Sequence, residues 1–213
     1  MTKDVKTRGY NSPLRREQAA RTRQRILDAA GDLFVRQGYG TTSIRRIADA
    51  AQVAPDTVYA TFGSKARLLT ALLDIRLAPG GQTSILDRPE TQAIREERDP
   101  RQLLRLFARD YAAMSERVRP VSEVLRTAKA IEPEMATVRE EIEAYRFEYM
   151  RTIVQWLALR AKLRVPVDRA AQIVWALASP DVGRMLCDVQ GWTTGEYASW
   201  LEDTLTTTLL AAR

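Results

Sequence analysis

The chain has one cysteine, Cys187, and no histidine among its 213 residues. A single thiol cannot form a disulfide within the chain or build a cysteine zinc cluster. The lack of imidazole excludes a histidine metal site and histidine acid–base catalysis. We therefore expect no metal and no cofactor. We expect Cys187 to be a small buried hydrophobic residue without a redox role.

Long apolar runs are absent too, so the sequence predicts no membrane-spanning segment. Residues 1–17 are polar and basic and lack the apolar core of a signal peptide, so we expect a flexible basic arm and a cytoplasmic protein. The sequence also lacks a phosphate-binding loop, a dinucleotide-binding glycine pattern and a serine nucleophile elbow. An all-α enzyme is therefore a weak hypothesis, and we assign no catalytic residues.

Positive charge is concentrated near the N-terminus. Residues 1–78 hold 14 Lys and Arg against 7 Asp and Glu, whereas residues 79–213 hold 19 against 20. Such an asymmetry favours a polyanionic partner for the first part of the chain. The alternative is a solvated surface that only keeps the protein soluble.

Apolar spacing and capping signals predict four helices in this basic part. Glycines at 38 and 40 end the first helix, hydroxyl residues at 41–43 cap the second, and Pro55 suits the first position of the third. The expected ranges are 18–36, 44–51, 55–62 and 65–78. Two short helices joined by a turn at 52–54 have the layout of a helix-turn-helix, which places one helix in the DNA major groove.

The remaining chain also reads as helical, with prolines between the helices and no convincing strand. Residues 79–99 are expected to be mainly loop with one short helical piece. The predicted helices are a stripe over 103–118, a short helix begun by Pro120, a long one from Pro133 to about Leu163, then 168–178, a short piece near Met185, and 196–211. The fold class is therefore all-α.

The motif resembles the tetracycline-repressor-like (TetR) family of transcriptional regulators. The resemblance covers about Arg21 to Leu73 and includes the segment ILDAAGDLFVRQGYGTTS before the turn. It implies a helix-turn-helix DNA-binding domain at 18–65, and a helical effector-binding and dimerisation domain at 66–213 whose first helix, 66–78, connects the two. The positions that carry it are Ile47, Ala48, Ala51, Val53, Thr57, Tyr59, Phe62, Ser64 and Lys65.

Outward-facing residues of the motif are the candidate DNA contacts. Tyr59 and Lys65 are expected at backbone phosphates, and Arg45 at a base edge or a phosphate. Thr42 and Ser43 are expected chiefly as caps of the second helix. Arg15, Arg16, Arg21 and Arg23 are expected to reach the backbone or the minor groove. The full candidate set is Thr42, Ser43, Arg45, Arg46, Pro55, Asp56, Thr57, Tyr59, Ala60, Thr61 and Lys65.

Four positions depart from the family pattern. Gln52 stands where the turn usually has glycine, so a left-handed backbone there would be costly. Ala54 replaces a hydroxyl cap, so Pro55 and Asp56 must help to begin the third helix. Asp56 is unusual next to a polyanion, and we favour a role at the helix terminus. Thr61 replaces a frequent histidine, which removes one possible DNA contact.

The resemblance further implies a homodimer, formed through helices 168–178 and 196–211, that binds a double-stranded DNA operator and a small-molecule effector. Asp110, Glu123 and Glu141 would favour a cationic or hydrogen-bonding effector if they face inward, although solvated surface is the simpler reading of each. Core packing is the alternative role for each apolar candidate. The effector candidates are Phe107, Tyr111, Met114, Tyr145, Tyr149, Met150, Trp156 and Trp175.

The hypothesis favoured by the sequence is a homodimeric repressor that a small molecule releases from its operator. An activator or an effector-independent regulator of the same fold stays open. A protein-interaction module with a degenerate DNA-binding head is a further alternative, supported only by the departures at Gln52, Ala54 and Thr61.

Overall fold

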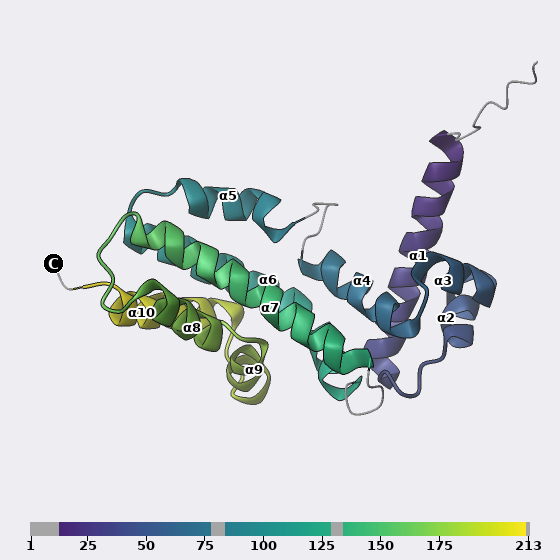
Figure 1. Ribbon diagram of the computed structural model, residues 1–213. Helices are drawn as coiled ribbons and strands as arrows, with labels where there is room; N and C mark the ends of the chain where they lie inside the picture. Colours follow the sequence, from purple (N-terminus) through teal and green to yellow (C-terminus); the bar gives the residue numbers. More distant parts are fainter. Residues whose placement is uncertain (1–12, 78–83, 129–133, 212–213) are drawn as a thin grey trace, which may run out of the picture.

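The computed structural model describes residues 13–77, 84–128 and 134–211, and its regular elements are helical apart from one isolated bridge between Leu163 and Leu210. The all-α prediction is confirmed. A small head is joined to an elongated body by α4 (Figure 1). The elements are α1 Pro13–Gln37, α2 Ile44–Ala51, α3 Pro55–Phe62, α4 Lys65–Leu77, η1 Ile85–Asp87, α5 Pro89–Glu96, α6 Pro100–Ala128, α7 Glu134–Ala158, α8 Val167–Leu177, α9 Pro180–Gly183, the π-helical turn η2 Arg184–Val189, and α10 Thr194–Leu209.

Helix α1 begins earlier than the apolar pattern predicted. Residues 14–17 are its first turns and not part of a flexible arm, so that part of the expectation is wrong. Glu17 pairs with Arg21 one turn later, at 2.5 Å, which supports a helix that has little to bury here. Residues 1–12, the rest of the expected arm, lie outside the described residues.

The head packs around the apolar face of α1. Ile26, Leu27 and Phe34 are fully buried there, against α2 and α4. Helix α2 buries Ile47 and Ala48. The small side chain of Ala48 leaves room for α2 and α3 to cross closely. The predicted core of the helix-turn-helix is therefore present, with α4 completing it.

The turn between α2 and α3 contains a strained residue. Gln52 has φ 56° and ψ 49°, and it is the single non-glycine residue with positive φ in the described part of the chain. Ala54 precedes α3 without any side-chain cap, so the helix begins with Pro55 and has Asp56 in its first turn. Both departures from the family pattern are thus visible in the backbone.

The body is built on two long helices, α6 and α7. Helix α10 packs along α6, α8 packs along α7, and α5 lies across α6. Pro120 does not begin a new helix as predicted, because α6 continues through it to Ala128. The apolar side chains on either side of this proline, Val118 and Val121 among them, are buried. A proline inside a helix costs roughly 3 kcal/mol, because it removes a hydrogen bond and its ring clashes with the preceding turn. Tertiary packing outweighs that cost here.

Other boundaries also differ from the sequence prediction. The segment 79–99, expected to be mainly loop with one short helical piece, contains the helix α5 and the additional 3-10 turn η1. Helix α7 ends at Ala158 and not near Leu163, which instead forms the bridge to Leu210. The short piece near Met185 is mostly π-helical.

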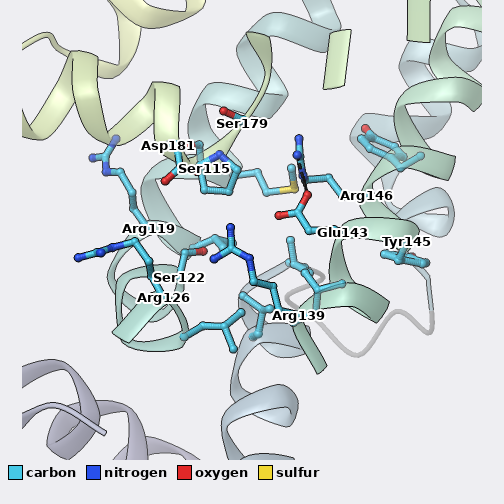
Figure 2. Close-up of a pocket in the computed structure, with 18 of the residues that line it drawn as sticks. Ser115, Arg119, Ser122, Arg126, Arg139, Glu143, Tyr145, Arg146, Ser179 and Asp181 are labelled. Atoms are coloured by element: carbon cyan, nitrogen blue, oxygen red, sulfur yellow. Dashed lines mark hydrogen bonds and ion pairs between the residues drawn. The ribbon is translucent and has the colours of Figure 1, made fainter. Parts of the chain in front are cut away.

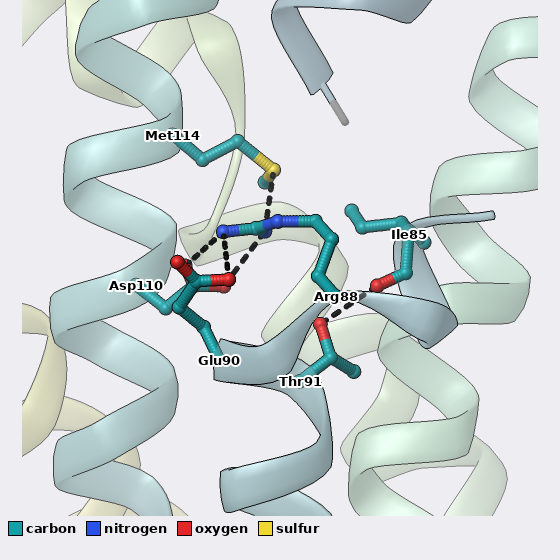
Figure 3. A network of polar contacts seen from close by, with 6 residues as sticks. All are labelled: Ile85, Arg88, Glu90, Thr91, Asp110 and Met114. Atoms are coloured by element: carbon teal, nitrogen blue, oxygen red, sulfur yellow. Dashed lines mark hydrogen bonds and ion pairs between the residues drawn. The ribbon is translucent and has the colours of Figure 1, made fainter. Parts of the chain in front are cut away.

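A buried ion pair fixes η1 and α5 to α6. The side chains of Arg88 and Asp110 are 3% and 7% exposed, and two hydrogen bonds of 2.6 and 3.0 Å join them (Figure 3). Thr91 donates to the carbonyl of Ile85 at 2.8 Å, and Arg88 also approaches the sulfur of Met114 at 3.8 Å. The segment that enters the body after α4 is therefore held by polar contacts rather than by apolar area alone.

Removing one partner of this pair should destabilise the fold strongly. We expect Asp110→Ala to lower the free energy of unfolding by about 3–5 kcal/mol, because it removes the buried counter-ion of Arg88 and leaves only the exposed Glu90 carboxylate beside the guanidinium. Glu90→Ala is the matched control. Its carboxylate also pairs with Arg88, at 3.3 Å, but its side chain is 57% exposed, so a loss of at most about 1 kcal/mol is expected. Urea unfolding of both variants measures the difference, and equal losses would contradict this role of burial.

Relieving the strain at the turn should stabilise the head. Gln52→Gly is expected to raise the free energy of unfolding by about 1 kcal/mol, because glycine adopts positive φ without a steric penalty. The same change at exposed Gln155, inside α7, should lower it by about 1 kcal/mol. Thermal unfolding of the two variants should therefore show shifts of opposite sign.

Candidate DNA-binding face and effector cavity

The outer face of α2 and α3 carries most of the predicted contacts. Arg45 and Arg46 are exposed on α2, and the Tyr59 side chain is 52% exposed on α3. Thr57 is half-buried, and the Thr61 hydroxyl donates to the carbonyl of Thr57 at 2.6 Å. The remaining exposed candidates on α3 are Pro55, Asp56, Ala60 and Thr61.

The two predicted caps of α2 have different roles. Ser43 is the N-cap, and its hydroxyl oxygen accepts from the backbone N–H of Arg46 at 3.3 Å. Thr42 is only 1% exposed and its hydroxyl donates to the carbonyl of Gly38 at 2.8 Å. The prediction that Thr42 caps α2 is therefore wrong. Its side chain faces α1, away from the outer surface of the head.

Lys65 also has contacts within the head. Its ammonium donates to the carbonyls of Tyr39 and Thr42, at 3.2 and 3.3 Å, and lies 4.0 Å from the centre of the Tyr39 ring. It therefore ties the first residue of α4 to the turn that precedes α2. Sequence reasoning, which placed this charge on a phosphate, missed the role, because the carbonyls involved lie more than 20 residues away.

The arginines expected in the arm lie on α1. Arg15 and Arg16 are exposed, and Arg21 pairs with Glu17. The guanidinium of Arg23 lies over the Phe62 ring at 4.6 Å, which brings positive charge to the end of α3. The basic face of the head therefore includes the N-terminal turns of α1 as well as α2.

The body contains a cavity of about 650 Å³ (Figure 2), within the range of small-molecule sites. Helices α4, α6 and α7 supply much of its wall, and residues 175–188 supply much of the rest. Six predicted effector residues line it: Tyr111, Met114, Tyr145, Tyr149, Met150 and Trp175. Burial raises the pKa of Tyr111 and Tyr149 well above the ordinary value, so both hydroxyls stay neutral.

Two predicted effector residues do not line the cavity. Phe107 is buried one turn before Tyr111, and its ring packs against Tyr111 and Tyr149 at 5.9 and 6.4 Å. Trp156 lies near the far end of α7, where Arg95 of α5 approaches its ring at 6.0 Å. Both side chains therefore have a packing role.

The cavity has many charged residues that the sequence prediction did not select. Of the three acidic candidates, Glu123 and Glu141 line it, whereas Asp110 is bound to Arg88. The signal for the missed residues is helical spacing, because Ser115, Arg119 and Ser122 continue the face of α6 that carries Tyr111. The charged lining residues are Asp74, Arg119, Glu123, Arg126, Arg139, Glu141, Glu143, Arg146, Asp181, Arg184 and Asp188.

Some of these charges neutralise one another. Arg126 forms hydrogen bonds of 2.5 and 2.9 Å to Glu123 and thereby lowers the pKa of that carboxyl. Arg146 binds Glu143 at 2.7 Å and also donates to the carbonyls of Trp175 and Ala178. The cavity is therefore an apolar space with a structured polar lining.

Cys187 lies on the π-helical turn, half-buried against the core, which is more exposed than expected. In the described ranges no group of three acidic, cysteine or histidine residues is placed to hold a metal ion. Across those same ranges, no helix is both long and apolar enough to cross a membrane.

Comparison with known proteins agrees with this architecture. Residues 26–72 match the family model described as "Bacterial regulatory proteins, tetR family". The HTH-type transcriptional regulator TtgR of Pseudomonas putida is 26% identical over 196 residues, which is 83% of this chain and 90% of TtgR.

Solved structures show the same fold over nearly the whole chain. NalD, the secondary repressor of the MexAB-OprM multidrug efflux pump in Pseudomonas aeruginosa, superposes with a TM-score of 0.68 at 23% identity, over 92% of this chain and 100% of NalD. FadR of Bacillus subtilis, solved with stearoyl-CoA, gives a TM-score of 0.67 at 19% identity, over 85% of this chain and 96% of FadR.

A helix-turn-helix head joined to a helical body defines a DNA-binding transcriptional regulator. Residues 26–72 are the helix-turn-helix domain of the TetR family of bacterial regulatory proteins, and the chain is a DNA-binding transcriptional regulator with that domain.

Proposed function

We propose that the protein is a homodimeric repressor whose release from its operator is controlled by a small molecule bound in the cavity. The observation that carries this proposal is the position of α4. Leu69 and Leu72 on this helix are buried, and the helix packs against α1 and α3 of the head. Thr70, Leu73, Asp74 and Leu77 of the same helix line the cavity.

A ligand that contacts α4 acts on the helix that orients the head. If the ligand favours one position of α4, the two recognition helices of a dimer no longer match half-sites about one helical turn apart. The short connection supports this mechanism, since α3 and α4 are separated only by residues 63 and 64. The effector effect thus requires no change within the head itself.

For the DNA contacts, we assign Tyr59 to a backbone phosphate and Arg45 to a base edge or a phosphate. Both are exposed on one side of the head, and their long side chains suit these roles. Ser43, Arg46, Pro55, Asp56, Thr57, Ala60 and Thr61 complete the proposed face. Lys65 is assigned to the contacts within the head described above. Substituting it would therefore change the stability of the head as well as any DNA binding, and the two effects could not be separated.

For the dimer, we assign the interface to α8 and α10. The two helices lie on the side of the body away from the head (Figure 1). Gln172 and Ala176 are exposed four residues apart on α8, as are Ser199, Asp203 and Thr207 on α10. These rows of short side chains would let the helices of two copies approach closely and pack around a two-fold axis.

The DNA assignment predicts distinct effects for two variants. Tyr59→Phe should weaken binding to every duplex, because it removes a phosphate contact. Arg45→Ala should cost about 1–3 kcal/mol on the operator alone if Arg45 reads a base, or lower the salt slope by about 1 if it contacts a phosphate. Gel-shift titrations at several salt concentrations, with the DNA flanking the gene and an unrelated duplex, measure this. Arg101→Ala, at an exposed arginine of the body, is the control, and unchanged binding in both head variants would refute the assignment.

The dimer assignment predicts loss of assembly from one surface change. Ser199→Arg should place a bulky charge in the interface of both copies and convert the protein to a monomer with weakened operator binding. Gln155→Arg, at an exposed position on α7, should leave the dimer intact. Light scattering coupled to size-exclusion chromatography gives the mass directly. A wild-type monomer, or a dimeric Ser199→Arg variant, would contradict this interface.

A further inference from the structure

The wall of the cavity contains two arginines without a carboxylate partner. Arg119, Arg126 and Arg146 are each bound to an acidic residue, at 3.0, 2.5 and 2.7 Å. Within the described residues, Arg139 and Arg184 have no such ion pair. The arginine charges of this site are therefore only partly compensated by the protein.

Arg139 is placed to meet a ligand. It lies on α7, is half-buried, and reaches toward the middle of the cavity between the labelled residues of α6 and those farther along α7 (Figure 2). The Nε of Arg184 is shielded from solvent without a hydrogen-bond acceptor. A buried guanidinium donor without an acceptor is costly, so a ligand that supplies acceptors is favoured here.

The unpaired carboxylates of the cavity compensate the charges of these two arginines only weakly. Asp74, Glu141 and Asp181 are all exposed residues, so water screens their charges. Partial burial also raises the pKa of the Asp74 carboxyl. The two unpaired arginines of the cavity are therefore more buried than its unpaired carboxylates.

The tryptophan ring that lines the cavity is already occupied by a cation of the protein. The Trp175 ring would be the natural partner of a cationic ligand, but the guanidinium of Arg146 already lies 4.6 Å from the centre of that ring. Met114, Val118 and Ile142 line the cavity as well and offer apolar surface.

From this arrangement we infer that the cavity binds an amphipathic organic anion, whose carboxylate or phosphate monoester is held by Arg139 while its apolar body packs against Met114, Val118 and Ile142. The guanidinium fork matches the oxygens of either headgroup in a bidentate contact. The inference rests on the proposed effector role of the cavity and names the chemical class of the effector.

Calorimetric titration of the intact protein with three ligands of the same chain length tests the charge. Decanoate should bind about tenfold or more tightly than decanamide, and decylammonium should bind most weakly. Decyl phosphate distinguishes the two headgroups, because tighter binding than decanoate identifies the phosphate monoester. Preference for decylammonium, equal affinity for decanoate and decanamide, or no binding of any anion would overturn the inference.

Substitution then tests the residue. Arg139→Gln should weaken decanoate binding about tenfold and leave decanamide binding unchanged, whereas Arg101→Gln, which removes an exposed arginine outside the cavity, should change neither. Thermal unfolding without ligand shows whether each variant is folded. A folded Arg139→Gln variant that binds decanoate like the wild type would overturn the assignment of the headgroup.

The same ligands separate this inference from the proposed function. If decanoate binds through Arg139 but leaves operator binding unchanged in a gel shift, the ligand class stands and the release mechanism fails. If operator binding is lost on adding decylammonium but not decanoate, the release mechanism stands and the ligand class fails.

Discussion

The packing of α4 between head and body is the constraint on which the rest of the structure depends. Leu68, Leu69, Leu72 and Leu73 are nearly fully buried, so this one helix supplies core to both parts. Helix α1 approaches it closely at Gly31, where an added Cβ would lie 3.3 Å from a methyl group of Leu72. A head of this size buries little surface of its own, and the buried leucines of α4, the helix that also borders the cavity, add to its core. Among these four leucines, Leu73 also lines the cavity.

Much of the head was predictable from the sequence because its signals are local. Pro55 at the start of α3, the glycines after α1 and the apolar spacing each act within one or two turns, and the predicted limits of α2 and α3 match the structure. The missed features depend on contacts distant in sequence. Lys65 bonds to carbonyls of the earlier turn, and Pro120 stays inside α6 because neighbouring residues are buried. No local pattern carries that information.

The cavity was predictable in its apolar part and not in its charged part. Aromatic residues and methionines stand out in a sequence as candidate lining, and six of the eight face the cavity. Arginines are common on surfaces, so Arg119, Arg139 and Arg146 carried no signal until the helices were placed. Asp110 shows the opposite error, because an acidic residue on the right helix is bound to Arg88. Pairing between distant elements decides which charges a ligand meets.

The Lys65 hydrogen bonds and the Arg88–Asp110 ion pair hold different parts of the molecule together. Lys65 joins the start of α4 to the turn before α2 and so ties α4 to the head. Arg88 joins η1 and α5 to α6 through a buried pair, so the segment that enters the body is fixed to the opposite wall. Between these two anchors lies the rest of α4, held mainly by apolar packing, which is non-directional and tolerates small shifts. A ligand that enters the cavity therefore contacts a wall that is held mainly by apolar packing between these two polar contacts, and that wall continues into the helix-turn-helix head.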